Sequence, residues 1–147
     1  MAGFEVVKWS LYVGCGLTHA PKAFRQEVTD TKTALRARWD VKDFKGLGEA
    51  EPGEVYDIDI IENVGTCDAF VGIMDEPSWG LGFETAMAAA REVPIMLAHH
   101  ESTRITRLAT DAALRVQNLV VVQYVDMVSD VPALADQHLV PMLTRAA

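Results

Sequence analysis

The sequence has little cysteine, no long hydrophobic run and no basic cluster. Only two cysteines occur in 147 residues, Cys15 and Cys67, and each lies in an apolar strand-like segment, so no disulfide is expected. No apolar run approaches the roughly 18 residues of a membrane span, and residues 1–5 lack the basic region and apolar core of a signal peptide. We therefore expect a cytoplasmic protein that has no membrane partner.

Basic charge is scarce as well. The chain has 13 lysines and arginines against 21 aspartates and glutamates, a net charge of −8, and its basic residues are scattered. Because such a surface repels a polyphosphate backbone, nucleic acid is not an expected partner, although a local pocket can still bind a single nucleotide. Half of the residues are hydrophobic, and residues 1–147 predict one domain that buries about 68 to 70% of its unfolded surface.

Short apolar runs that suit buried parallel strands alternate with helical segments along the chain. We predict strands at 8–15, 37–44, 69–74, 93–98 and 119–124, and helices at 21–38, 54–66, 83–91, 102–114 and 131–143. Residues 45–53 are loop-like, and the helix that follows them carries Val55, Ile58, Ile61 and Val64 at intervals of three as its expected buried stripe. The alternation predicts a single doubly wound α/β domain, flavodoxin-like or Rossmann-like, with a five-stranded parallel sheet and helices on both faces.

The segment from Cys67 to Glu84 combines a buried strand, a glycine-rich turn and a carboxylate. We expect Pro77, Gly80 and Gly82 to form a loop, with Glu84 near the first turn of the next helix. In open parallel sheets the ligand crevice lies outside the carboxyl ends of the strands, and glycines allow the backbone to approach a ligand closely. The alternative is that Glu84 only favours the positive end of a helix dipole, worth roughly 0.3 to 1 kcal/mol.

Three aspartates in and directly after the helix predicted at 54–66 can share a crevice with Glu84. Asp57 and Asp59 lie two residues apart near a helix start, so at most one of them should point inward, and Asp68 precedes the strand. Paired carboxylates suit cleavage of a glycosidic bond, because one stabilises or attacks the anomeric carbon while the other donates a proton to the leaving group. The alternatives are that the helix aspartates act as caps and that Asp68 binds backbone at a strand entry.

This pattern resembles the nucleoside 2-deoxyribosyltransferases and the related 2′-deoxynucleoside 5′-phosphate N-hydrolases. The residues that carry the resemblance are Asp59, Asp68 and the motif Pro-Ser-x-Gly-x-Gly-aromatic-Glu at Pro77 to Glu84. The resemblance implies that Glu84 is a nucleophile at the anomeric carbon and that Asp59 contacts the sugar or protonates the base. Asp59 and Asp68 are nine positions apart where the family has eight, so one inserted residue is required in the helix or loop, and Asp57 remains the alternative.

The resemblance also implies substrate-binding residues around the first loop and the motif. Gly14, Gly16 and Thr18 lie in a turn that is similar to the transferase version, under the substrate. Ser78 points to the hydrolase branch, in which this serine contacts a 5′-phosphate.

Three further positions have competing interpretations. Trp79 suits stacking on a nucleobase or packing between subunits, and Gly80 and Gly82 shape the site through their backbone. Thr106 lies where such proteins reach the site of a neighbouring subunit, although a threonine on a helix surface is the simpler interpretation.

We therefore expect an enzyme that cleaves the N-glycosidic bond of a nucleoside or nucleotide, with transfer to water or to a second base left open. No metal or redox cofactor is expected, since His99 and His100 lack further residues at ligand spacing. The resemblance implies a homodimer or higher homo-oligomer. The alternative is a non-catalytic nucleotide-binding or assembly module on the same fold.

Overall fold

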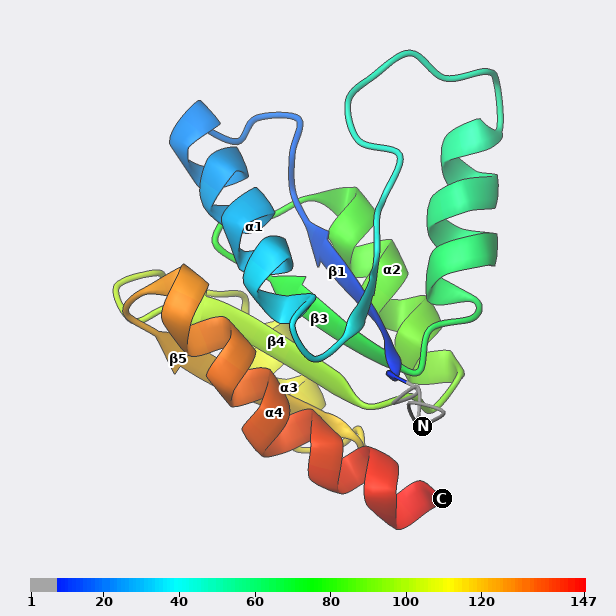
Figure 1. Ribbon diagram of the computed structural model, residues 1–147. Helices are drawn as coiled ribbons and strands as arrows, with labels where there is room; N and C mark the ends of the chain where they lie inside the picture. The colour runs from blue at the N-terminus through cyan, green and yellow to red at the C-terminus, as the bar shows by residue number, and fades with distance from the viewer. Residues whose placement is uncertain (1–7) are drawn as a thin grey trace, which may run out of the picture.

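The computed structural model describes residues 8–147, in which five strands alternate with helices (Figure 1). In chain order the elements are β1 (Ser10–Cys15), α1 (Lys22–Leu35), β2 (Asp40–Lys42), η1 (Tyr56–Val64), β3 (Ala69–Ile73), α2 (Trp79–Ala90), β4 (Ile95–His100), α3 (Arg107–Ala113), β5 (Leu119–Tyr124) and α4 (Met127–Ala146). The predicted α/β fold is confirmed. The second strand, which the sequence indicates only over a broad range, is three residues long.

The strands form one parallel sheet in the order β2-β1-β3-β4-β5. This is the flavodoxin-like order, and it changes direction between β1 and β3. Because every strand runs the same way, the loops that follow β1, β2 and β3 leave the sheet at the same edge. A parallel doubly wound sheet binds ligands at this edge, outside the point where the strand order reverses.

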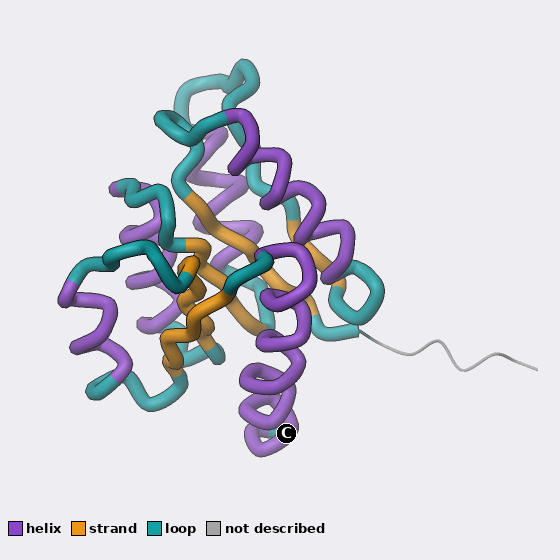
Figure 2. Tube along the Cα trace, turned by 90° about the vertical axis from the view of Figure 1, so that its left-hand side faces the viewer, coloured by secondary structure: helices purple, strands orange, loops and turns teal. Residues whose placement is uncertain are grey.

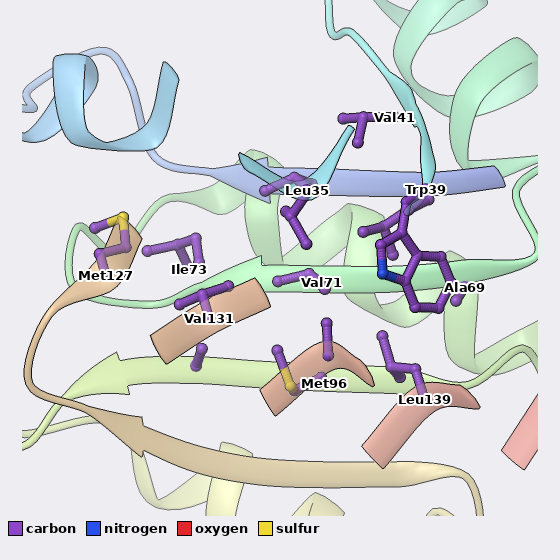
Figure 3. Close-up of a cluster of buried hydrophobic side chains, with 14 of the residues drawn as sticks. Leu35, Trp39, Val41, Ala69, Val71, Ile73, Met96, Met127, Val131 and Leu139 are labelled. Atoms are coloured by element: carbon purple, nitrogen blue, oxygen red, sulfur yellow. The ribbon is translucent and has the colours of Figure 1, made fainter. Parts of the chain in front are cut away.

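Helices cover both faces of the sheet, so the strands form the middle layer in Figure 2. On the face covered by α1 and α4, side chains of alternate strand residues pack with Leu35 and Leu139 (Figure 3). Val71 and Met96 are among these buried side chains, and neither is measurably exposed. On the opposite face, Tyr12 and the strand residues that alternate with this first set pack against η1, α2 and α3.

The helix η1 is a π-helix, which corrects the predicted stripe. The amide of Gly65 donates to the carbonyl of Ile60, five residues earlier. A helix with this wider turn does not repeat every three to four residues. Val55 and Ile61 are therefore exposed, whereas Val64 is buried as predicted, and the other buried side chains of η1 are Asp59, Ile60 and Asn63.

Capping side chains move three helix starts away from the predicted ones. Ser78 accepts a hydrogen bond from the amide of Leu81 at 3.0 Å, so α2 starts at Trp79 rather than at residue 83. Thr106 caps α3, which starts at Arg107 rather than near residue 102, and Asp126 caps α4, which starts four residues before the predicted residue 131. Within residues 8–147, no helix has both the length and the hydrophobicity needed to cross a membrane.

Candidate active site

A cavity of about 470 Å³ opens at the carboxyl ends of β1 and β3, where the strand order reverses. Its walls come from the loops after β1, β2 and β3, from η1 and from the start of α2. The lining residues are Cys15, Gly16, Leu17, Thr18, His19, Ala20, Phe44, Gly46, Leu47, Asp59, Glu76, Pro77, Ser78, Trp79, Gly80, Leu81 and Glu84. Its size lies within the range of about 300 to 1,000 Å³ that is usual for small-molecule sites.

Glu84 lies on the second turn of α2 and lines this cavity. Residues of β1 hold its carboxylate in place. The hydroxyl of Tyr12 donates to Glu84 Oε1 at 2.8 Å. The other carboxylate oxygen lies over Gly14, because a Cβ atom at that position would be 2.5 Å from Glu84 Oε2. Gly14 does not line the cavity, but its missing side chain makes the room in which the carboxylate of Glu84 rests.

Asp59 is the aspartate of η1 that faces the site. It is only 8% exposed and lines the cavity with Glu84, whereas Asp57 is exposed and does not line the cavity. The Oδ1 atom of Asp59 accepts the amide of Lys45 at 2.8 Å, which ties the loop after β2 to the site. A π-helical turn accommodates one more residue than an α-helical turn, which suits the inserted residue that the resemblance implies between Asp59 and Asp68.

Burial makes both carboxyl groups weaker acids than usual. Desolvation raises the pKa of Glu84 to about 7, and the negative charge of Asp59 contributes to the rise. The pKa of Asp59 is also raised by burial, against the opposing effects of the Lys45 amide and the Lys32 charge. The hydrogen bond from Tyr12 and the charge of Lys32 limit the rise at Glu84, since both favour the ionised carboxylate. Near neutral pH the carboxyl group of Glu84 is therefore present in both its protonated and its ionised form.

Lys32 is an unexpected buried cation beside this pair. It lies on α1, is 5% exposed, and its ammonium stands 3.5 Å from the centroid of the Phe44 ring. Its nearest carboxylate partner, Asp43 Oδ1, is 3.9 Å away. Burial lowers the pKa of Lys32.

The loops after β1 and β3 pack directly against each other through Gly16. A Cβ atom at Gly16 would lie 2.2 Å from the carbonyl oxygen of Glu76, so any side chain would force the two loops apart. Thr18 lines the same side of the cavity. The glycine of this first loop is therefore required by a close backbone approach within the protein.

Ser78 and the glycines after it form the start of α2 instead of the predicted loop. Ser78 and Gly80 line the cavity, whereas Gly82 does not. Ser78 acts as the helix cap, so its side chain already accepts one hydrogen bond. Trp79 also lines the cavity, its side chain is 84% exposed, and its ring centroid lies 5.3 Å from that of Phe83, so it does not fill the cavity.

Two other predicted residues lie away from this cavity. Asp68 accepts the amide and the hydroxyl of Ser10, at 2.8 Å and 3.1 Å, at the amino end of β3, which matches the alternative interpretation as a strand-entry residue. Thr106 caps α3 and lines a separate, mostly apolar cavity of about 660 Å³ between α2 and α3. Its role across a dimer stays a prediction.

Another carboxylate, that of Asp75, lies at the same edge of the sheet, just after β3. Asp75 Oδ1 accepts the amide of His100 at 2.9 Å and the hydroxyl of Thr103 at 2.5 Å. Its Oδ2 accepts the hydroxyl of Tyr124 at 2.5 Å. Asp75 thus joins the ends of β3, β4 and β5, and it does not line the cavity of Glu84.

Sequence reasoning did not identify Tyr12, Lys32, Phe44 or Glu76 as site residues. Tyr12 carries a recognisable signal, because a tyrosine in an otherwise apolar strand needs a partner for its hydroxyl when buried. Lys32 lies on the buried face of α1, among the apolar residues of that helix. Neither pattern reveals which distant residue is the partner.

The fold and the cavity define a class: a flavodoxin-like α/β protein with a carboxylate pair at the switch point of its sheet. No protein-family model and no curated protein matches the sequence. Among solved structures, the chain is similar to the CMP N-glycosidase BcmB of Clostridium botulinum, with a TM-score of 0.64 at 19% identity over 85% of this chain and 97% of that one. It is also similar to a conserved protein of Enterococcus faecalis V583, with a TM-score of 0.57 at 17% identity over 89% of this chain and 99% of that one.

The first of these structures has the nucleoside 2-deoxyribosyltransferase-like fold, so the resemblance read from the sequence is confirmed for the fold. At these identities the likeness concerns the fold alone.

Proposed function

We propose that this protein cleaves the N-glycosidic bond of a nucleoside or nucleoside 5′-monophosphate, with Glu84 as nucleophile and Asp59 as proton donor. The observation that carries the proposal is the pairing of these two carboxyl groups in one cavity at the switch point. Support at the level of the fold comes from the shared architecture with an enzyme named as a CMP N-glycosidase.

In the proposed first step, a carboxylate oxygen of Glu84 attacks the C1′ atom of the sugar. The bond between C1′ and the base nitrogen breaks, its electron pair passes to the base, and protonated Asp59 donates a proton to the departing base. A glycosyl ester of Glu84 remains. In the second step, water or another base attacks C1′, the carboxylate of Glu84 departs, and the acceptor gives its proton to Asp59.

The environment of each group suits its proposed role. Burial raises the pKa of Glu84 to about 7, but Tyr12 and the charge of Lys32 oppose the rise, so the ionised form that attacks is populated from neutral pH upward. Burial favours the protonated form of Asp59, which is the form that donates. By resemblance, a 2-deoxy sugar is favoured over ribose, and both water and a second base remain candidates for the acceptor.

The test is release of free base, followed by chromatography, from a panel of deoxynucleosides, ribonucleosides and their 5′-monophosphates, with and without an acceptor base. Glu84→Gln should lower the rate of base release by roughly 10³-fold or more. Glu62→Gln is the matched control, because Glu62 is exposed and does not line the cavity. Silence across the panel from folded protein, with nucleotide binding retained, would favour the binding-module alternative.

A further inference from the structure

The buried ammonium of Lys32 shares its carboxylate partner, Asp43, with Arg36. Asp43 Oδ1 lies 2.7 Å from Arg36 Nη2 but 3.9 Å from Lys32 Nζ. The side chain of Asp43 is also 66% exposed, whereas that of Lys32 is 7% exposed. Asp43 therefore pairs mainly with Arg36 at the surface and offsets little of the charge of Lys32. A buried cation that is only partly compensated in this way is costly unless other negative charge lies near it.

The ring of Phe44 fixes the position of this charge. The ammonium of Lys32 lies 3.5 Å from the ring centroid, which is a cation–π contact. Phe44 lines the cavity together with Asp59 and Glu84, whereas Lys32 does not line it. The positive charge is therefore held against a residue of the cavity wall without contacting the space that a substrate would fill.

The charge of Lys32 acts on both carboxyl groups of the proposed mechanism. It lowers the pKa of Glu84 and that of Asp59, in each case against the effect of burial. Among the described residues that line the cavity there is no lysine or arginine. Besides Glu84 on α2, the charged and titratable groups around Lys32 are Cys15 on β1, Arg36 beyond α1, Asp43 after β2 and Asp59 on η1.

The proposed reaction moves a negative charge between these two residues. Glu84 starts as a carboxylate and becomes a neutral ester, while Asp59 starts as an acid and becomes a carboxylate when its proton passes to the base. The second step returns the charge to Glu84 and the proton to Asp59. A fixed cation near both groups stabilises the negative charge at either position and does not need to move during the reaction.

We propose that Lys32 is the shared counter-ion of Glu84 and Asp59, held on the ring of Phe44 so that it stabilises the negative charge on whichever of the two carries it. Lys32 is a positioning residue rather than a catalytic one, because it acts through the two carboxyl groups and does not line the cavity. The inference rests on the proposed function and adds to it a residue from α1.

The experiment is Lys32→Met, which keeps an unbranched apolar chain against Phe44 and removes the charge. With a substrate that the unaltered protein cleaves, kcat should fall by roughly 10- to 100-fold, while KM should change by less than about threefold. Both limbs of the pH–rate profile should move to higher pH, because loss of a nearby cation raises the pKa of Glu84 and of Asp59. Lys32→Arg, which keeps the charge, should restore the limbs and part of kcat. Lys22→Met is the matched control and should change neither, since Lys22 is an exposed lysine of α1 that does not line the cavity.

A second measurement needs no substrate and keeps Lys32 in place. In protein labelled with ¹³C-lysine, the NMR titration of Lys32 should give a lower pKa in Asp59→Asn than in the unaltered protein, because the negative charge of Asp59 raises the pKa of Lys32. This comparison decides the question if Lys32→Met does not fold, and an unchanged pKa of Lys32 would overturn the inference.

Two outcomes of the kinetic experiment would also overturn it. One is full activity of Lys32→Met, and the other is a loss of kcat with both limbs in place, which would mean that Lys32 only supports the packing of Phe44. Both leave the proposed N-glycosidase function standing. If the unaltered protein releases base from no substrate, the proposed function fails, and the inference fails with it.

Discussion

Two tyrosine–carboxylate pairs stand at the same edge of this sheet and differ in what surrounds them. In one, Tyr12 donates to Glu84 at 2.8 Å, and in the other Tyr124 donates to Asp75 at 2.5 Å. Asp75 receives two more donors, from His100 and Thr103, so both of its oxygens are occupied. Glu84 receives Tyr12 alone among the described residues, and its second oxygen rests in the space over Gly14.

The difference separates a carboxylate that holds the fold together from one whose surroundings suit the proposed chemistry. A carboxylate with several donors is stabilised as an anion and joins the segments that supply those donors. A buried carboxylate with one donor keeps an unshared oxygen for a reaction and is easily protonated, and burial accordingly raises the pKa of Glu84 to about 7. The same pair of residue types therefore serves the fold in one place and suits chemistry in the other.

The largest effect on the fold should come from Asp75→Asn. The amide side chain keeps the shape but loses the charge and replaces one acceptor oxygen by a donor, which leaves Tyr124, Thr103 or His100 without its partner. We expect a loss of about 2 to 4 kcal/mol in the free energy of unfolding, measured by urea titration.

The folded fraction of Asp75→Asn should keep its activity to within about tenfold, because Asp75 does not line the cavity. A variant as stable as the unaltered protein, but inactive, would contradict the structural role assigned to Asp75.

The next effect concerns the pH dependence of stability, which Glu84→Gln should flatten. Because the folded state raises the pKa of Glu84 from 4.5 to about 7, the folded protein binds this proton more tightly than the unfolded chain. The resulting stabilisation is fully present below pH 4.5 and is lost as the pH rises through about 7. The full loss amounts to about 3 to 3.5 kcal/mol.

Unfolding titrations of both proteins at pH 5 and pH 8 measure this loss. The unaltered protein should lose more stability between these values than Glu84→Gln, and parallel losses would show that Glu84 titrates normally.

The alternation of strands and helices was enough to predict the sheet, because runs such as the one from Ala69 to Ile73 are apolar at every position. The starts of the helices were predicted less accurately than the strands. Gly80 and Gly82 favour a loop by propensity, but the Ser78 cap and the burial of Leu81 keep both glycines in α2.

The site was predicted in part. Glu84 and Asp59 emerged as candidates from the motif and its resemblance, but the choice between Asp57 and Asp59 depends on the π-helical turn of η1, which hydrophobic periodicity does not reveal. Tyr12 was not predicted as a site residue because its partner, Glu84, is 72 residues away in the sequence. Strand alternation indicates which face of the sheet a side chain lies on, but it does not indicate which distant residue that side chain contacts.

The smallest and most specific effect should distinguish the two tyrosines. Tyr12→Phe removes the donor that lowers the pKa of Glu84, so the pKa should rise, and the acidic limb of the pH–rate profile should move to higher pH. With this shift we expect a loss of about 10- to 30-fold in kcat/KM at pH 7, on the order of 1.5 to 2 kcal/mol. Tyr124→Phe is the matched control, because the same atom is lost from the pair that lies outside the cavity. It should lower stability by about 1 kcal/mol and leave the limb in place. If the acidic limb moved equally in both variants, its position would depend on the whole fold rather than on the pKa of Glu84. The distinction between the two tyrosine–carboxylate pairs would then be wrong.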